Sequence, residues 1–386
     1  MLHPAVLSLL LVIASALYSY LLMWLTLRPW RLARNEHWTE RARWLWMARV
    51  ARFFVFLGAV AIGTAVWLEQ RNDAHMLPIA LAVMAGYFAA SFLIDRRIEP
   101  RYTLRFWLSL LFWKIGIIYA LVGTVAWTAY STSVNVTGTD WLRIAAAAVV
   151  MSVIYSGVWL LLLPNRDKQP QTPRLRQIVD EVAAQAGLGP ARAWVAESVT
   201  ANAVAFMFIR SIVVTSRAME VLNDDEVRTL VQHEMAHLRE SLAVRCARLL
   251  GGLSWLGFAF TRPVVHRIDF LGVFWIFLGV MLVRRFTQNV AKRMENRADS
   301  MSATNDDEGP VYARALEKLY EANQMPAVMN KRLVHPHLYD RMTAAGLTPD
   351  YPRPAPPPKR HWTSLAALLP PMLWFFWLGF RSAGKL

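Results

Sequence analysis

The pentapeptide HEMAH, residues 233–237, lies in a stretch that reads as one helix from about residue 224 to residue 250. Asn223 immediately precedes this stretch, and Glu226 lies three residues after Asn223. An Asn with a Glu three positions later is typical of a helix N-terminus, because each side chain binds the backbone N–H of the other. The motif is therefore predicted to lie inside a helix.

The two histidines of this motif are four residues apart, so His233 and His237 project from one face of the helix and can hold a single ion. Zinc takes imidazole and carboxylate ligands and leaves a position open for water. Glu234, beside the first histidine, can hold such a water. The pattern predicts one Zn²⁺ per chain. The alternative is a solvated helix that matches the motif by chance.

The composition indicates a membrane protein. The chain has 386 residues, of which 55% are hydrophobic, and it contains 17 Trp and 18 Phe. Several apolar runs approach or exceed the roughly 18 residues that cross a bilayer. Cys246 is the single cysteine, which excludes an intrachain disulfide and a zinc site made of thiolates.

Five apolar runs predict an N-terminal transmembrane region over residues 1–163. Arginine-rich links at 28–52 and 95–105 alternate with weakly charged or uncharged links at 69–75 and 131–140. Arginine-rich links stay inside, so the N-terminus is predicted outside and everything after the fifth run in the cytoplasm of a bacterial-type inner membrane. The runs are 5–27, 53–68, 76–94, 106–130 and 141–163.

The net charge of +15 admits nucleic acid as a partner, and the segment 28–52 interleaves arginine with tryptophan. The arginines cluster at the ends of apolar runs, however, which fits the positive-inside rule better. We interpret 28–52 as a cytoplasmic loop and interfacial helix with an aromatic belt, and no nucleic-acid partner is predicted.

The rest of the chain alternates between a catalytic domain and membrane segments. Helical periodicity at 174–187, with Gly187 as a C-cap, and strand-like runs at 192–198 and 211–216 predict an α+β domain. The predicted segments are 164–248 with the HEMAH helix, 249–283 as a membrane hairpin, 284–349 as the second catalytic part, 350–361 as a proline-rich linker, and 362–386 as a C-terminal apolar segment.

Glu295 is the candidate third zinc ligand, since two histidines are one short of a usual catalytic site. His237 lies about 12 residues before the predicted hairpin and Glu295 about 12 after it, so two adjacent helices would carry both to roughly 18 Å from the membrane. Neither Glu240 nor Glu317 has a comparable argument. Asp299, one turn beyond Glu295, is a candidate hydrogen-bond partner for the second ring nitrogen of a ligand histidine.

The expected chemistry is peptide hydrolysis. Bound zinc brings the pKa of its water near neutrality and polarises a peptide carbonyl. Glu234 would take the proton of that water and later deliver it to the leaving amine. The oxyanion would be held by the metal and by nearby donors.

HEMAH followed by ENRAD (295–299) resembles the HExxH…ExxxD pattern of the HtpX and CAAX prenyl protease family of integral-membrane zinc metallopeptidases. Other pieces resemble the family in the same order, and the resemblance covers about residues 174–345. The five N-terminal runs show no specific match, although their number is closer to the prenyl protease branch. The other pieces are ANAVAF (201–206), SIVVTSRAMEVLNDDEVRTLVQHEMAH (211–237) and HPHLYDR (335–341).

The resemblance implies a role for each matching residue. It implies that an edge strand pairs with an extended substrate peptide, and that a His and an Arg near the end stabilise the oxyanion or the substrate. The implied zinc ligands are His233, His237 and Glu295, the base is Glu234, the support of a ligand histidine is Asp299, the edge strand contains Asn202, Ala203 and Val204, and the late pair is His335 and Arg341.

The predicted fold is mainly α, with polytopic membrane helices and a gluzincin-like α+β zinc metallopeptidase domain that has a small edge-stranded sheet. The predicted function is that of a membrane-embedded zinc endopeptidase acting on membrane-associated or lipidated proteins, with the lipid bilayer as its surroundings. The alternative is a membrane binding or transport protein with a structural or regulatory zinc site. Structural sites, however, usually use cysteines and need no glutamate beside the first histidine.

Overall fold

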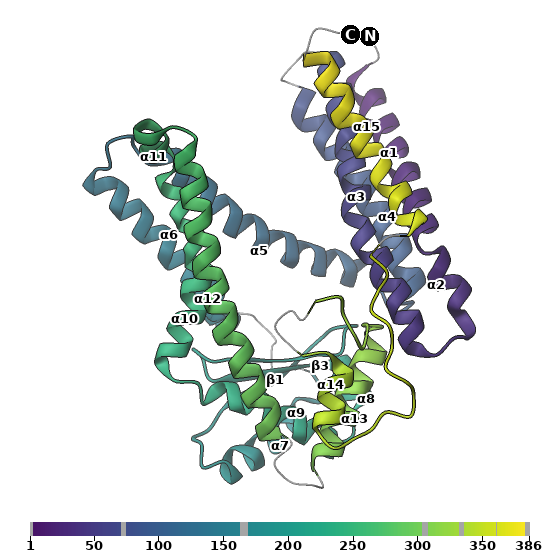
Figure 1. The fold of residues 1–386 in the computed structure, drawn as a ribbon, viewed down its shortest axis with the longest axis vertical. Coiled ribbons are helices and arrows are strands. Elements are labelled where there is room, and N and C mark those ends of the chain that lie inside the picture. Colours follow the sequence, from purple (N-terminus) through teal and green to yellow (C-terminus); the bar gives the residue numbers. More distant parts are fainter. Residues whose placement is uncertain are drawn as a thin grey trace. The chain divides into compact units, whose positions relative to one another are not determined.

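The computed structural model describes residues 3–70, 75–162, 169–302, 308–331, 336–359 and 361–382. It is mainly helical with one small sheet, which confirms the predicted fold class (Figure 1). Within those residues, eight helices are long and apolar enough to cross a bilayer. The chain is therefore a multi-pass membrane protein.

The chain forms two compact units, each described separately below. The first consists of Met1–Trp107, Tyr320–Lys331 and Tyr351–Leu386, and the second of Leu108–Leu319 and Arg332–Asp350.

The first unit is a bundle of long apolar helices. Small residues let its helices approach closely: a Cβ on Gly86 would lie 2.4 Å from the carbonyl oxygen of Val12, and Ser15 Oγ donates to Val83 O at 2.8 Å. Such close packing is typical of helices in membranes. The bundle consists of α1 (Pro4–Thr26), α3 (Trp38–Gln70), α4 (Met76–Ile98) and α15 (Trp362–Ser382).

The arginine- and tryptophan-rich segment 28–52 differs from its prediction. It begins with the short helix α2 (Arg28–Leu32) and the 3₁₀ turn η1 (Ala33–Asn35), and α3 then runs unbroken from Trp38 to Gln70. The second membrane helix thus starts well before residue 53. Its early part is helical because Leu45 and Ala48, three residues apart, are buried in the core of the bundle.

The same unit holds the end of α13 (Glu308–Ala322). Arg49 of α3 donates to the carbonyls of Asn323 at 3.1 Å and Gln324 at 3.2 Å, and Trp30 Nε1 donates to the side chain of Gln324 at 2.9 Å. Gln324 has φ +47°, a left-handed conformation that is unusual without glycine. These three hydrogen bonds help to offset the free-energy cost of this backbone conformation.

The second unit contains the other membrane helices, except for the first residues of α5, up to Trp107, which belong to the first unit. Two candidate spans, Leu242–Ile268 and Leu271–Ser302, cover the region of the predicted hairpin at 249–283, which stays a prediction. They pack closely, since a Cβ on Gly251 would lie 2.6 Å from Thr287 Oγ1. The elements are α5 (Leu104–Ser131), α6 (Gly138–Ser156), η3 (Val158–Leu162), α10 (Leu242–Leu253), η4 (Ser254–Phe260), α11 (Thr261–Ile268) and α12 (Leu271–Ser302).

A three-stranded sheet lies in the second unit, in the order β1-β3-β2. β1 runs parallel to β3, while β2 pairs antiparallel with β3 and forms an edge, as predicted. The helix α9 contacts β2 and β3, and α7 contacts β1. The elements are α7 (Thr172–Gln185), β1 (Arg192–Ala196), β2 (Ala203–Phe206), β3 (Ser211–Thr215), α8 (Ser216–Val221), α9 (Asp224–Leu238) and α14 (Leu338–Ala344).

The helix that carries HEMAH is shorter than predicted, which corrects the continuous helix expected to residue 250. The first helix, α9, ends at Leu238, and Ser241 then caps a new helix, α10, by accepting from Val244 N at 3.4 Å. Arg245 donates to the carbonyls of Leu238 and Glu240 at 2.8 and 2.9 Å. The backbone groups released by the break are therefore partly satisfied.

Candidate metal centre

Three buried side chains from two helices converge in the second unit. His233 and His237 come from α9 and Glu295 from α12, and each offers a ligand atom within 4.8 Å of the others. The Nε2 atoms of the histidines lie 3.6 and 3.5 Å from the two carboxylate oxygens of Glu295. Ligands about 2.0–2.1 Å from a tetrahedral zinc are about 3.3 Å apart. The spacing therefore fits three groups around one ion.

The outer nitrogen of His233 is fixed by Tyr312, which lies in α13 and is 1% exposed. The Tyr312 hydroxyl donates to Asp299 Oδ1 at 2.8 Å and lies 2.8 Å from His233 Nδ1. Burial raises the pKa of Tyr312 well above its usual value, so the hydroxyl keeps its proton. Because that proton goes to Asp299, the oxygen accepts from Nδ1–H. The Nε2 lone pair of His233 therefore remains for a metal.

Arg341 of α14 completes this cluster. Its Nε and Nη2 atoms donate to Asp299 Oδ2 and Oδ1 at 3.0 and 2.6 Å, and Nη2 also donates to Tyr312 at 2.7 Å. A bidentate pair of this kind fixes the carboxylate in place. The structure thus places Arg341 on the Nδ1 side of His233. The contact of Arg341 with an oxyanion, which the resemblance implied, stays a prediction.

The outer nitrogen of His237 is fixed by Glu240, which is 4% exposed. Glu240 Oε1 lies 2.8 Å from His237 Nδ1 and also accepts from Arg248 Nη2. An ionised carboxylate only accepts hydrogen bonds, so Nδ1 of His237 carries the proton and its Nε2 lone pair is directed to the metal position. Both histidines thus show the arrangement typical of zinc ligands.

The charge around His233 favours a cation. Burial lowers the pKa of His233, but its interactions with Asp299 and Glu295 outweigh this effect and raise the pKa to about 9. In the metal-free protein a proton therefore occupies this ring at neutral pH. A divalent ion would take the place of that proton, since both neutralise the same carboxylates.

The family model of peptidase family M48 matches residues 169–347. Residues 169–347 are an M48 peptidase domain. This family contains HtpX and the CAAX prenyl proteases, so the resemblance seen in the sequence is confirmed. M48 metallopeptidases are in general zinc-dependent, in agreement with the His-His-Glu donor set. No curated protein matches the chain.

Glu234 is the predicted general base of the M48 domain. It is buried at 7% exposure and adjoins His233 in α9. Its charge contributes to the raised pKa of His233, so it lies close enough to act electrostatically at the metal position. The role of base stays a prediction.

The predicted substrate strand is the edge strand β2 of the M48 domain. Asn202 O accepts from Thr215 N at 2.9 Å, and Asn202 N donates to Thr215 Oγ1 at 2.8 Å. Backbone groups alternate along a strand, so those of Ala203 and Ala205 point away from β3. The Val204 side chain is 41% exposed. β2 thus presents an edge beside α9.

One predicted site residue lies outside the described residues, and the structure shows two further residues at the site that were not predicted. His335 lies outside the described residues. Tyr312 and Glu240, which hold the two ligand histidines, were not predicted. Glu240 had one signal in the sequence, since it lies three residues after His237, the spacing at which helical side chains meet. Tyr312 had none, because α13 reaches the site only through the fold.

Proposed function

We propose that this protein is a membrane-embedded zinc endopeptidase that hydrolyses peptide bonds of membrane-associated or lipidated proteins, with Glu234 as its general base. The observation that carries the proposal is the convergence of His233, His237 and Glu295, with the Nδ1 atom of each histidine fixed by a buried acceptor. A closed structural site would not need an acidic residue beside its first ligand.

The residues of the chain divide the work of the reaction. Zinc, when bound by His233, His237 and Glu295, supplies an acidified water and polarises the peptide carbonyl. Glu234 accepts the proton of the attacking water at its carboxylate and returns it to the leaving amine. Tyr312 and Glu240 keep the ligand rings in one tautomer and orientation, so that no reorganisation is needed during turnover.

The edge strand supports an extended peptide as substrate. The outward backbone groups of Ala203 and Ala205 can form a ladder with such a peptide, and β2 contacts the helix that carries Glu234. Recognition through the peptide backbone requires few particular side chains in the substrate. Specificity would then come from access to the site.

The membrane helices support a substrate close to the bilayer. The hairpin ends in the apolar run up to Val283, and Glu295 follows about 12 residues later on the same helix α12, which corresponds to roughly 18 Å. We place the domain on the cytoplasmic face of a bacterial-type inner membrane, because the arginine-rich links then lie inside.

The decisive experiment compares the full-length protein with Glu234→Gln in lipid vesicles. Zinc content and cleavage of an unstructured protein such as casein are measured together. We expect the variant to keep about one zinc per chain and to lose at least about a thousandfold in cleavage rate, since both the base and the acid role disappear. Glu220→Gln, an exposed acid of α8, is the matched control.

The outcomes separate the two readings. Chelation should abolish cleavage and added Zn²⁺ should restore it. Equal activity of Glu234→Gln and the unaltered protein would remove Glu234 as base. A protein that keeps zinc and cleaves nothing would fit the alternative of a membrane protein with a structural zinc site. Proteins trapped by membranes that contain Glu234→Gln, identified by mass spectrometry, would name the substrate.

A further inference from the structure

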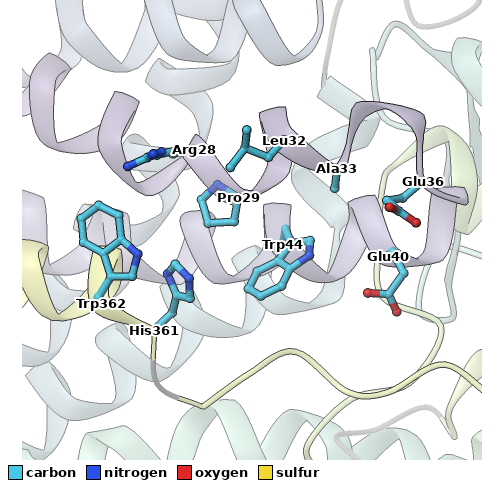
Figure 2. Close-up of a pocket in the computed structure, with 9 residues that line it drawn as sticks. All are labelled: Arg28, Pro29, Leu32, Ala33, Glu36, Glu40, Trp44, His361 and Trp362. Atoms are coloured by element: carbon cyan, nitrogen blue, oxygen red, sulfur yellow. The ribbon is translucent and has the colours of Figure 1, made fainter.

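A cavity of about 720 Å³ is lined by residues of the first unit, and none of them belongs to the candidate metal centre. It is formed by α2, η1, the first turns of α3 and the segment that enters α15 (Figure 2). This volume is within the range of roughly 300–1,000 Å³ that is typical of small-molecule sites. The residues used below are Arg28, Glu36, Glu40, Trp44, His361 and Trp362.

The lining of the cavity is positive at one end and negative at the other. Figure 2 shows Arg28 near Trp362 at one end and Glu36 and Glu40 at the other, with Trp44 between them. The Arg28 guanidinium lies 5.7 Å from the centre of the Trp362 ring. No acid of the described chain forms an ion pair with it.

The acidic end has one charge that is not neutralised. Glu40 pairs with Arg43, whereas Glu36 forms no ion pair among the residues that the structure places. At the basic end, His361 Nδ1 lies 2.8 Å from Thr363 Oγ1 and accepts from Thr363 N at 3.4 Å. Because Nδ1 accepts from Thr363 N, a ring proton lies on Nε2. His361 therefore adds a donor to the basic end.

The basic end of the cavity lies at the boundary of the membrane. Arg28 follows two residues after the candidate span that ends at Thr26, and Trp362 begins the last candidate span. Arginine and tryptophan at the ends of spans are typical of the headgroup region. The helix α3 has 33 residues, about 50 Å in length, so it extends beyond a hydrocarbon layer of about 30 Å. Glu40 and Trp44 lie in its first two turns.

We propose that this cavity binds the headgroup of a membrane phospholipid in which a phosphate is followed by an amine, as in phosphatidylethanolamine. The phosphate accepts charged hydrogen bonds from Arg28 and a bond from His361 Nε2. The ammonium lies against the Trp44 ring and toward Glu36. The acyl chains extend into the bilayer at the end formed by Arg28 and Trp362.

The charged side chains at the two ends of the cavity favour a zwitterionic headgroup over a phosphate alone or a nucleic-acid strand. A headgroup with a phosphate alone would leave Glu36 without a cation. The arginine- and tryptophan-rich sequence also suggests a nucleic-acid strand. Its phosphates would lie near both glutamates, and the like charges would repel each other. A zwitterionic headgroup matches both ends of the cavity.

The test measures which lipid remains on the protein. Full-length protein is reconstituted in vesicles with equal parts of phosphatidylethanolamine, phosphatidylglycerol and phosphatidylcholine, extracted gently, and weighed by native mass spectrometry. We expect phosphatidylethanolamine to be retained in preference to phosphatidylglycerol. Arg28→Gln should lower its retention about tenfold, the usual effect of losing a charged hydrogen bond. Arg34→Gln, an exposed arginine of η1 outside the cavity, should not change it.

A second variant tests the amine. Glu36→Gln removes the charge that selects the ammonium, so retention of phosphatidylethanolamine should fall and its preference over phosphatidylglycerol should be lost. Both Arg28 and Glu36 are exposed, so these substitutions leave the core intact. Unchanged retention in Arg28→Gln, or a preference for phosphatidylglycerol in the unaltered protein, would overturn the proposal.

A competition arm identifies the source of the phosphate. Soluble glycerophosphoethanolamine carries the same phosphate and amine without acyl chains. If it displaces the retained lipid at equal concentration, the ligand is a soluble phosphate ester and not a lipid. We expect no displacement at that concentration. Lipid retention is read without any cleavage assay, so this result is independent of the peptidase proposal.

Discussion

Glu240 Oε1 lies 2.8 Å from His237 Nδ1, on the side of the ring opposite to Glu295. The carboxylate also accepts from Arg248 and is almost fully buried. One acidic residue in the break between α9 and α10 therefore fixes a candidate zinc ligand. This function explains why the break places a charged side chain inside the domain.

Glu240→Ala should weaken zinc binding by about ten- to a hundredfold, the usual effect of removing the outer partner of a ligand histidine. Glu240→Gln keeps an acceptor oxygen without the charge, so its loss should be smaller. Zinc affinity is measured by competition with a chelating dye. Glu220→Ala, on the exposed face of α8, serves as control. Tight zinc binding by Glu240→Ala would contradict the role given to this carboxylate.

Tyr312→Phe removes the hydroxyl that joins His233, Asp299 and Arg341 while the ring stays in the core. We expect zinc affinity to fall about tenfold. The free energy of unfolding should fall by about 1–3 kcal/mol, because buried partners lose a hydrogen bond. Chelator competition and thermal unfolding measure the two effects. Tyr119→Phe, at an exposed tyrosine of α5, should change neither quantity.

The metal-free protein should lose stability between pH 6.5 and pH 9. In the folded state the pKa of His233 is about 9, against an ordinary value of 6.5, so the folded protein binds this proton more tightly. The resulting stabilisation is complete below pH 6.5 and disappears as the pH rises through 9. Thermal unfolding across this range measures it.

Two controls belong to the pH experiment. His233→Gln has no titrating ring at this position, so this part of the pH dependence should disappear. Zinc replaces the proton, so the zinc-loaded protein should not show it either. A metal-free protein whose unfolding temperature falls equally in His233→Gln would assign the effect to other groups.

The orientation in the membrane can be tested with single cysteines. In a Cys246→Ser background, Asn135→Cys marks the uncharged link and Glu197→Cys marks the M48 domain, and both positions are exposed. A membrane-impermeant maleimide applied to intact cells should label position 135 and not position 197. The reverse pattern would place the catalytic domain outside. Labelling after lysis checks that both positions are reactive.

Local features of the fold follow from the sequence. The capping box at the start of α9 forms as predicted, with Asn223 accepting from Glu226 N at 2.9 Å and Glu226 accepting from Asn223 N at 3.0 Å. The edge position of β2 is also confirmed. The capping box depends only on residues three positions apart. The edge strand was predicted from a motif whose residues stand in the same order in this sequence. The membrane spans were equally visible because length and apolarity define them.

Features that depend on distant contacts did not follow. The helical periodicity continues through residues 239–241, so the sequence showed no break, and the contacts of Glu240 and Arg245 decide it. The structure nevertheless brings Glu295 to the histidines, because α12 runs unbroken to the site. Tyr312 reaches His233 from a helix 79 positions later, a contact that no local pattern encodes.

The break at residues 239–241 gives the three candidate ligands different mechanical attachments. Both histidines lie on the short helix α9, which packs on the sheet, whereas Glu295 lies on α12, a helix of 32 residues that contains a candidate membrane span. The helix α12 also packs along α9, so a change in bilayer thickness that tilts α12 would be transmitted to the metal centre that the two helices form. We therefore expect bilayer thickness to affect this centre, so acyl-chain length should be held fixed wherever zinc binding or cleavage is compared.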